Sequence, residues 1–289
     1  MAGRLLIVGT PIGNLGDLTP RAADALRTAT LVVAEDTRLA QRLLGHLGVR
    51  RPTSAFNDHN AEERLPALLA RLAAGETLAL TTDAGMPGVS DPGARLVAAA
   101  RTAGASVEVL PGPSAVTAAL AVSGVEAVGF VFGGFLPARP AAVRWAALER
   151  LLAAGGATRL PLILFEAPHR VAALLAALEA AVPEARVAVC RELTKLHEQV
   201  VVGTVAEVAA ALGAPRGEFT LVISDLPERD QAAAGAVDVE ALVEAAGREG
   251  LSDRSIVELL RGAGLGRREA YRLVGRTNPG EDKGSVSSR

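Results

Sequence analysis

Short apolar runs alternate with helix-like segments through the first 110 residues, and this order is the feature that most constrains the fold. The apolar runs cover residues 5–8, 31–34, 78–81 and 107–110. Helical patterns lie between them, at residues 19–28, 39–47, 62–74 and 94–103. Thr19 and Pro20 are a suitable N-cap and first residue for the earliest of these helices. Because strands that alternate with helices form parallel sheets, the order predicts an α/β domain.

The second half of the chain continues the pattern with more strands than helices. Strands are predicted at residues 130–132, 162–165, 187–190, 200–202 and 220–223, and helices at residues 115–122, 141–154 and 171–181. The runs at 187–190 and 200–202 are too close for a crossover helix, which favours antiparallel pairing between them. We therefore expect four parts: an α/β domain at 1–112, a second α/β domain at 113–227, a small basic helical extension at 237–276 and a disordered tail at 277–289.

Composition narrows the class of protein. Hydrophobic residues make up 49% and charged residues 21% of the 289 residues, which is typical of a globular protein. No apolar run reaches the 18 or so residues that cross a bilayer, and the first residues lack the pattern of a signal peptide. Cys190 is the only cysteine, so neither a disulfide within the chain nor a cysteine-based metal cluster is expected. The sequence thus predicts a cytoplasmic protein.

Charge gives two further clues. The formal net charge is −2, which does not indicate a nucleic-acid-binding protein as a whole, yet residues 254–276 carry six Arg and two Glu. Twenty-eight of the thirty basic residues are Arg, and Lys195 is the only lysine outside the last seven residues. A lysine kept in such a background favours a role for a compact point charge that Arg does not reproduce.

The loop after the third apolar run reads TTDAGMPGVSDPG, at residues 81–93. It combines two carboxylates with three glycines and two prolines, which fix unusual backbone geometry and let a ligand approach the main chain. Ligands of open α/β sheets bind at the carboxyl ends of strands. Other strand ends carry comparable loops, at residues 9–20, 34–38, 110–115, 165–170 and 191–195. Recurrence at several strand ends favours a ligand site over an ordinary surface loop.

The individual loops restrict the chemistry. The first has neither the GK[ST] of a P-loop nor the G-x-G-x-x-G spacing, so a kinase or dinucleotide-binding function is poorly supported. Helix capping explains Asp36, Asn60 or Ser114 in part, but capping does not need a histidine beside a carboxylate, which makes Asp58 and His59 an acid/base candidate. No second His or Cys lies at ligand spacing, so no metal site is expected.

Taken as an ordered set, these segments resemble the ribosomal small-subunit RNA 2′-O-methyltransferases of the tetrapyrrole methylase superfamily. The matching segments are TPIGNLGDLTPRA (10–23), AEDTR (34–38), NDHN (57–60), DAGMPGVSDPG (83–93), LPGPSA (110–115), GFLP (134–137), FEAPHR (165–170), RELTKLHE (191–198) and GEF (217–219). They span nearly all of residues 4–223. Thr82 stands where the family pattern has Ser, and the hydroxyl is kept.

The resemblance implies a two-domain α/β fold of the tetrapyrrole methylase type, usually a homodimer, with S-adenosylmethionine in a cleft between the domains. It implies as substrate a cytidine ribose at the decoding centre of 16S ribosomal RNA, equivalent to cytidine 1402, in free RNA or in the small subunit. The cofactor pocket would involve Pro11, Asp83, Met86, Ser114, Ala115, Phe165, Glu218, Phe219 and Thr220. The candidates for the base or stabilising cation are Lys195, His59, Asp58 and Glu166.

The chemistry that the resemblance implies fits the residues present. Methyl transfer from a sulfonium is an in-line displacement that rests on positioning and needs no metal. The ribose hydroxyl is a weak acid, so a base or a cation must act in the transition state. If Lys195 is partly buried, its pKa would fall and the side chain could also act as the base. The basic segment at 254–276 would hold RNA phosphates or form a dimer contact.

Two other functions remain open from the sequence. A superfamily methylase acting on a tetrapyrrole or another small molecule would need neither the basic extension nor the NDHN and RELTK segments. A non-catalytic RNA-binding or assembly module would not bind the cofactor, so a cofactor titration distinguishes it from both enzymes.

Overall fold

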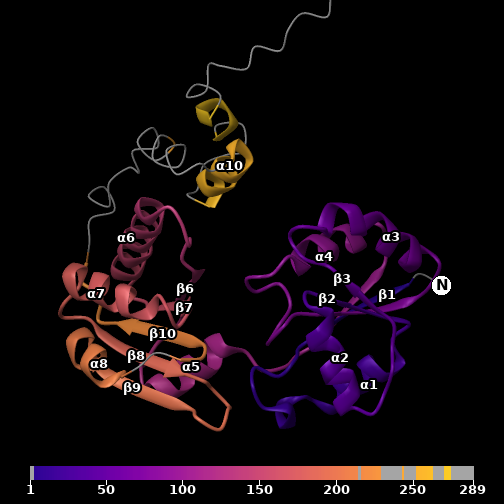
Figure 1. The fold of residues 1–289 in the computed structure, drawn as a ribbon, viewed down its shortest axis with the longest axis horizontal. Helices are drawn as coiled ribbons and strands as arrows, with labels where there is room; N and C mark the ends of the chain where they lie inside the picture. Colours follow the sequence, from indigo (N-terminus) through magenta and orange to yellow (C-terminus); the bar gives the residue numbers. More distant parts are fainter. Residues whose placement is uncertain (1–2, 214–215, 229–242, 244–251, 263–269, 275–289) are drawn as a thin grey trace, which may run out of the picture. The chain divides into compact units, whose positions relative to one another are not determined.

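The structure is a computed structural model that describes residues 3–213, 216–228, 243, 252–262 and 270–274 (Figure 1). Most of the predicted extension at 237–276, and the whole predicted tail at 277–289, lie outside these residues. Among the described helices, none has the length and apolar character needed to cross a membrane.

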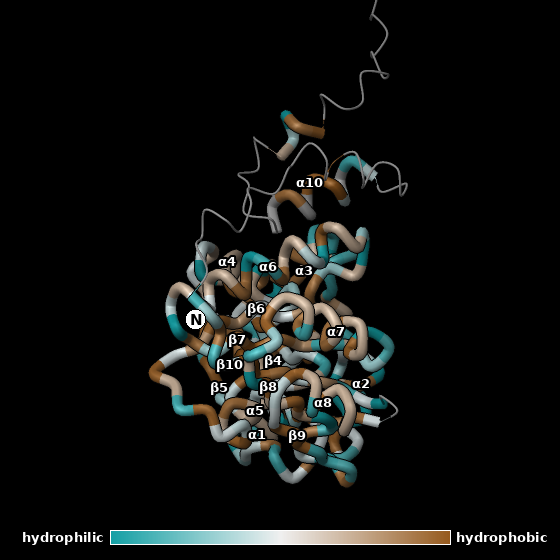
Figure 2. Tube along the Cα trace, turned by 90° about the vertical axis from the view of Figure 1, so that its left-hand side faces the viewer, coloured by the Kyte–Doolittle hydropathy of each residue, from teal (hydrophilic) through white to brown (hydrophobic). Residues whose placement is uncertain are grey.

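The first sheet is parallel in all its recorded pairings and contains five strands in the order β3-β2-β4-β1-β5. The strands are β1 (Arg4–Val8), β2 (Leu31–Ala34), β3 (Thr53–Ala55), β4 (Thr77–Thr81) and β5 (Ser106–Leu110). All four residues of β2 and the last four of β1 and β4 are buried, as expected for strands covered on both faces. Figure 2 colours the chain by hydropathy and shows brown, hydrophobic stretches of chain in the region labelled β4.

Helices cover both faces of this sheet (Figure 1). They are α1 (Pro20–Thr28), α2 (Thr37–His46), α3 (Ala61–Ala73) and α4 (Gly93–Thr102). Leu6 and Val8 of β1 pack with α1 and α2, whereas Leu5 and Ile7 pack with α3 and α4. Successive strand residues point to opposite faces, so one short strand contributes to two separate cores.

The second sheet follows α5 (Ala115–Ser123) and has the order β6-β7-β10-β8-β9. Its strands are β6 (Val131–Phe135), β7 (Leu162–Glu166), β8 (Arg186–Arg191), β9 (Gln199–Thr204) and β10 (Phe219–Ser224). Strands β6 and β7 are parallel. Strands β8 and β9 are neighbours, and their predicted antiparallel direction stays a prediction.

The helices of the second half are α6 (Ala141–Thr158), α7 (Val171–Ala181), α8 (Val205–Ala211) and α10 (Asp253–Gly262). Helix α6 packs on β6 and β7, and α7 packs on α8. Val143 of α6 forms a cluster with Val243, with residues of α10 and with Ala270 and Val274. The described part of the C-terminal region therefore buries an apolar face against α6.

The chain divides into two compact units. The first comprises Met1–Val125, Ala188–Val202 and Arg216–Thr220, and the second comprises Glu126–Val187, Gly203–Pro215 and Leu221–Arg289. Two segments from the second half thus belong to the first unit: the first contains most of β8 and β9 with the turn between them, and the second contains the start of β10. The domain limits predicted from the sequence, 1–112 and 113–227, stay predictions.

The expected α/β class, with strands and helices in the predicted order, is confirmed, and the differences are local. Helix α6 runs to Thr158, four residues past its predicted end. Strand β3 and helix α8 were not predicted. Strand β3 has only three residues, all half-buried, so it leaves no apolar run. Helix α8 begins with a capping box, in which the side chains of Thr204 and Glu207 each accept a hydrogen bond from the other residue's backbone N–H.

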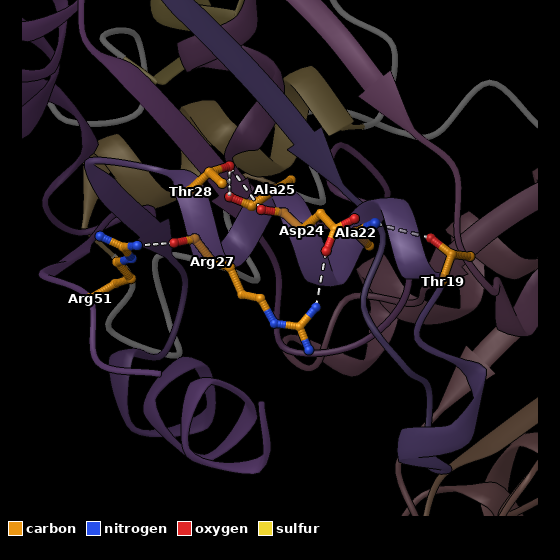
Figure 3. Close-up of polar contacts among 7 residues, drawn as sticks. All are labelled: Thr19, Ala22, Asp24, Ala25, Arg27, Thr28 and Arg51. Atoms are coloured by element: carbon orange, nitrogen blue, oxygen red, sulfur yellow. Dashed lines mark hydrogen bonds and ion pairs between the residues drawn. The ribbon is translucent and has the colours of Figure 1, made fainter. Parts of the chain in front are cut away.

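The start of α1 follows the first ligand-type loop and is fixed by Thr19. Its Oγ1 accepts a hydrogen bond of 3.2 Å from the backbone N–H of Ala22, as the sequence predicted for an N-cap (Figure 3). At the other end of the helix, the Arg51 guanidinium donates to the carbonyl of Arg27. The loop that precedes α1 is therefore anchored to a helix held at both ends.

We expect Thr19→Ala to lower the free energy of unfolding by about 1 kcal/mol, because the Ala22 N–H loses its acceptor. Thr19→Ser keeps a hydroxyl at the same position and should stay close to the unsubstituted protein. Urea unfolding followed by circular dichroism measures both. Equal losses in the two variants would show that the methyl group of Thr19, and not its hydrogen bond, stabilises this helix end.

Candidate functional site

Three loops of the first unit meet at the carboxyl ends of β1, β4 and β5. Thr10, after β1, forms an isolated antiparallel bridge with Gly85, after β4, through N–H···O bonds of 2.9 and 3.1 Å. The backbone N–H of Gly9 donates to the carbonyl of Leu110, at the end of β5, over 3.0 Å. These main-chain bonds bring together segments that lie 75 and 101 residues apart in sequence.

Glycines make this approach possible. A Cβ atom on Gly9 would lie 2.6 Å from the nitrogen of Gly112 and 2.7 Å from Met86 Sδ, and one on Gly112 would lie 2.9 Å from Gly9 Cα. The N–H of Gly112 also points to Met86 Sδ over 3.3 Å. The two backbones are thus in direct contact, with the methionine side chain against them. Any larger residue at Gly9 or Gly112 would separate the loops.

The loops carry five of the nine residues expected to hold the cofactor: Pro11, Asp83, Met86, Ser114 and Ala115. All five belong to the first unit, and Ser114 occupies the N-cap position of α5. Its side chain makes no capping hydrogen bond. A helix start with spare N–H groups and an uncommitted hydroxyl suits a carboxylate or another polar ligand group.

The other expected cofactor residues lie elsewhere. Phe165 is half-buried in β7 of the second unit, with ring centroids 5.1 Å from Phe132 and 5.4 Å from Phe135. Phe219 and Thr220 are buried in β10, so only their main chain is suited to a ligand contact. Glu218 is exposed and belongs to the first unit.

Carboxylates gather at the ends of β2 and β4. Asp83 Oδ1 accepts a hydrogen bond of 2.9 Å from the N–H of Asp36, and Glu35 Oε2 accepts one of 2.9 Å from Thr82 Oγ1. Burial, with a further effect from neighbouring carboxylates, raises the pKa of Glu35 and that of Asp83. Glu35 is a residue of this region that the sequence interpretation missed, although it lies within the AEDTR segment. The Thr82 hydroxyl, where the family pattern has Ser, is used as a donor.

Asp58 and His59 follow β3 in a tight polar turn. Asn60 Oδ1 accepts from the N–H of Asn57 over 2.9 Å, and Asn57 Oδ1 accepts from the N–H of His59 over 3.2 Å. Both candidate side chains are exposed, and Asp58 lies 3.7 Å from Arg95. Among the described residues, neither forms a hydrogen bond or ion pair with Lys195. The turn shapes the start of α3, and an acid/base role for the pair stays a prediction.

Glu166 lies in a buried ion-pair network of the second unit. Its carboxylate contacts the Arg144 guanidinium, lies 2.8 Å from Arg170 Nε and accepts a hydrogen bond of 2.8 Å from the N–H of Ala167. The Glu166 and Arg144 side chains are 0% and 6% exposed. Acting as a base would require this carboxylate to leave two guanidinium groups, so the geometry favours a structural role.

Lys195 lies in the first unit, at the turn after β8. Its Nζ donates hydrogen bonds of 2.9 Å to Glu192 Oε1 and to Glu218 Oε2. Burial lowers the pKa of Lys195, but these hydrogen bonds outweigh burial, so the pKa is raised overall. The expected fall in the pKa of Lys195 is therefore wrong in direction, and the role of Lys195 in the reaction stays a prediction. The side chain is partly buried, as supposed, but it is held as a cation.

The Lys195 side chain also touches the loop after β1. A Cβ atom on Gly13 would lie 2.4 Å from Lys195 Cγ and 2.9 Å from its Cε. Gly13 is two residues after Pro11 in the loop whose Thr10 bonds Gly85. The loops after β1, β4, β5 and β8 thus form one connected set within the first unit. Within the described part of the chain, no group of three His, Cys, Asp or Glu side chains is arranged to hold a metal ion.

Two sheets with glycine-rich loops at the carboxyl ends of the first sheet define an α/β ligand-binding protein. The chain matches the family of Tetrapyrrole (Corrin/Porphyrin) Methylases over residues 4–209, which is more than half of its length, and it belongs to this family. Relatives named Ribosomal RNA small subunit methyltransferase I include one from Xylella fastidiosa, 47% identical over 235 residues that cover 80% of this chain and 84% of the relative. One from Micromonospora olivasterospora is 42% identical over 281 residues, which cover 94% of this chain and 87% of the relative.

Solved structures of low identity share the fold. Diphthine synthase aligns with a TM-score of 0.62 at 15% identity, covering 77% of this chain and 90% of that one. Uroporphyrin-III C-methyltransferase from Thermus thermophilus, complexed with S-adenyl homocysteine, aligns with a TM-score of 0.55 at 21% identity, covering 78% and 98%. At these identities the likeness concerns the fold alone.

We expect Gly9→Ala to destabilise the fold by about 1–3 kcal/mol, because the added methyl group meets the Gly112 backbone and Met86 Sδ. Gly45→Ala is the matched control, since a Cβ at that position in α2 has no neighbour within 4 Å. The control should be neutral or stabilise the helix by up to about 1 kcal/mol. Urea unfolding tests both, and a Gly9→Ala variant as stable as Gly45→Ala would contradict the close loop contact.

We expect Glu35→Gln to stabilise the protein at pH 8, with a gain that disappears in acid. Burial raises the pKa of Glu35 in the folded state, so the ionised carboxylate weakens folding above that pKa. As pH falls through the folded pKa towards the unfolded value of about 4.3, Glu35 becomes neutral and the difference closes. Urea titrations at pH 8 and pH 4.5 measure it. A gain that is larger in acid would contradict the assignment.

Proposed function

We propose that this protein transfers a methyl group from S-adenosylmethionine to ribosomal RNA of the small subunit. Membership in a methylase family and several relatives named as ribosomal RNA small subunit methyltransferases support the reaction and the substrate. In the structure, the main support for this proposal is the contact of the Lys195 side chain with the glycine-rich loop after β1. That contact joins the only lysine of residues 1–282 to the loops expected to bind the cofactor.

The finer proposal is that the acceptor is the 2′-hydroxyl of a cytidine at the decoding centre of 16S ribosomal RNA, equivalent to cytidine 1402. This position rests on the ordered set of sequence motifs. We further propose that the protein acts in the cytoplasm as a homodimer. Strand β5 lies at the edge of the first sheet and leaves the Val109 side chain 57% exposed, where a second copy would pack, and sedimentation of the purified protein tests the dimer.

The residues of the loops fit the proposed cofactor. S-adenosylmethionine would supply an electrophilic methyl group on a sulfonium. Asp83 accepts one backbone hydrogen bond through Oδ1 and retains acceptor capacity for a ligand. The N–H groups at the start of α5 and the Ser114 hydroxyl suit the ligand's carboxylate. Met86 and Pro11 add apolar surface beside the main chain.

In the proposed transfer, the bond between the methyl carbon and sulfur breaks while a bond between that carbon and O2′ forms. The hydroxyl proton leaves to water. Negative charge develops on O2′ as the proton departs, and a fixed cation near this oxygen stabilises it. Lys195 is the cation in this account, and Asp58 with His59 is the alternative acid/base pair. The reaction then depends mainly on positioning.

Reconstituted methyl transfer tests the proposal. The purified protein is incubated with S-adenosylmethionine labelled in the methyl group and offered naked 16S RNA, isolated small subunits or a uroporphyrinogen. We expect label on one cytidine ribose of the RNA, located by mapping of 2′-O-methylation. Label on the tetrapyrrole would favour a small-molecule methylase. Cofactor binding without transfer to any acceptor would contradict the proposal, and RNA binding without cofactor binding would favour an assembly module.

We expect Asp83→Ala to weaken S-adenosylmethionine binding by roughly 1–3 kcal/mol, because the ligand loses a carboxylate acceptor. Calorimetry in the presence of a chelator measures the affinity without metal. Asp83→Asn keeps an acceptor for the Asp36 N–H but removes the negative charge. Comparing the two variants therefore distinguishes a role of Asp83 in holding the loop from a direct contact with the ligand. Asp24→Ala, which removes an exposed carboxylate paired with Arg27 on α1, is the control and should not change the affinity. Unchanged binding by Asp83→Ala would make Asp83 a turn residue only.

A further inference from the structure

Two glutamates from separate segments hold the ammonium group of Lys195. Glu192 belongs to the turn after β8, and Glu218 lies just before β10, 23 residues after Lys195. Glu192 Oε1 accepts from Lys195 Nζ over 2.9 Å and from the N–H of Glu218 over 3.1 Å. The N–H of Glu192 in turn donates to the carbonyl of Glu218 over 3.1 Å. The two segments are therefore joined by main-chain bonds as well as by the lysine.

The backbone around this cluster is constrained. Glu192 and Thr194 have φ values of +52° and +66°, in the left-handed region that side chains other than glycine adopt at a cost. Gly217 has a φ of +79°, and a Cβ there would lie 2.3 Å from Glu192 Oε1. The Glu192 carboxylate thus lies directly on the Gly217 backbone. Strain of this kind persists where the surrounding contacts enforce one geometry, as they do here.

The arrangement differs from an ordinary surface ion pair, which stabilises a fold by little. The side chains of Lys195 and Glu192 are 29% and 21% exposed, and the stem of Lys195 lies on Gly13. Glu218 is 74% exposed, so it adds charge on the open side of the cluster. The positive charge of Arg191 helps to lower the pKa of Glu192. The Glu198 carboxylate accepts a hydrogen bond of 2.6 Å from the N–H of Thr194. Residues 10–14, the segment that contains Gly13, carry no titratable side chain.

We propose that Glu192 and Glu218 are positioning residues, which keep Lys195 as a cation and aim its ammonium group at the hydroxyl of the substrate. The catalytic use of that cation rests on the proposed function, whereas its charge and placement do not. A cation kept in one place costs no rearrangement when charge develops on O2′. The same two carboxylates disfavour the neutral amine, which is the form that could act as a base, since neutral lysine would leave two negative charges without their shared partner.

Selective labelling of lysine at Cε makes the charge of Lys195 measurable by NMR, because the chain has only two lysines. In a Lys283→Arg background, the single remaining signal reports Lys195. We expect its titration midpoint above the ordinary lysine value of about 10.4. Glu192→Gln and Glu218→Gln should each lower that midpoint. Glu76→Gln removes a carboxylate that is nearly as buried as that of Glu192 and is paired with Arg71 at 2.7 Å, and it should leave the Lys195 midpoint unchanged. A midpoint below 10.4, or one that neither Gln variant moves, would overturn the proposal.

The pH profile of single-turnover transfer to RNA tests the use of the cation. With Lys195 as a cation, the rate should rise with pH as the hydroxyl ionises and then fall above the lysine midpoint. A plateau above that midpoint would make Lys195 the base and overturn the proposal. Glu192→Gln should slow transfer at least about tenfold and move the alkaline fall to lower pH, with cofactor affinity retained.

Lys195→Arg is the informative replacement, because it keeps the charge but changes its shape and donor geometry. We expect it to lose most of the transfer while binding the cofactor, as should Lys195→Ala. Near-normal transfer by Lys195→Arg would overturn the claim that the two glutamates aim one compact group. If no RNA is methylated at all, the proposed function fails, and the NMR titration still decides whether Glu192 and Glu218 hold the lysine as a cation.

Discussion

The contact between the Gly9 and Gly112 backbones is the constraint on which the loops of the first unit depend. Parallel strands end at one edge of a sheet, but their loops normally diverge over the surface. Here the absence of two Cβ atoms lets the ends of β1 and β5 touch, with Met86 against them. The Thr10–Gly85 bridge adds the loop after β4. Because the bonds are main chain to main chain, side chains such as Asp83 and Ser114 remain available for a ligand.

Glycines also allow close contacts around Lys195. Gly13 lets the Lys195 stem lie on the first loop, and Gly217 lets the Glu192 carboxylate lie on the main chain before β10. Each glycine removes a side chain where a charged group needs to approach the backbone. The consequence is an ammonium group with fixed neighbours, in a protein whose other basic positions are almost all arginine. A compact charge is required because two carboxylates converge on one atom, Nζ.

The sequence predicted much of this and missed what depends on tertiary contacts. Strands such as β2 and β4 were found because they are buried on both faces and read as apolar runs. The loops were found because Gly, Pro and Asp interrupt those runs. Nothing local shows that Glu192 and Glu218 share one lysine, or that Arg144 reaches Glu166 from 22 residues away. Burial alone predicted a lowered pKa for Lys195, and the direction was wrong because both partners became visible only in the fold.

The ion pairs of Glu166 limit which of the candidate residues can take part in the reaction. A carboxylate enclosed by Arg144 and Arg170 is costly to disturb, since removal of one partner leaves a buried charge without compensation. Glu192 and Glu218 both bond Lys195, although this cluster is more exposed than the Glu166 network. The exposed pair Asp58 and His59 is then the only named candidate whose groups are not bound in a charge cluster of this kind, apart from the long contact of Asp58 with Arg95. Because a sulfonium carries a good leaving group, the transfer that we propose relies on a fixed cation and release of the proton to water, with electrostatic positioning in place of a dedicated base.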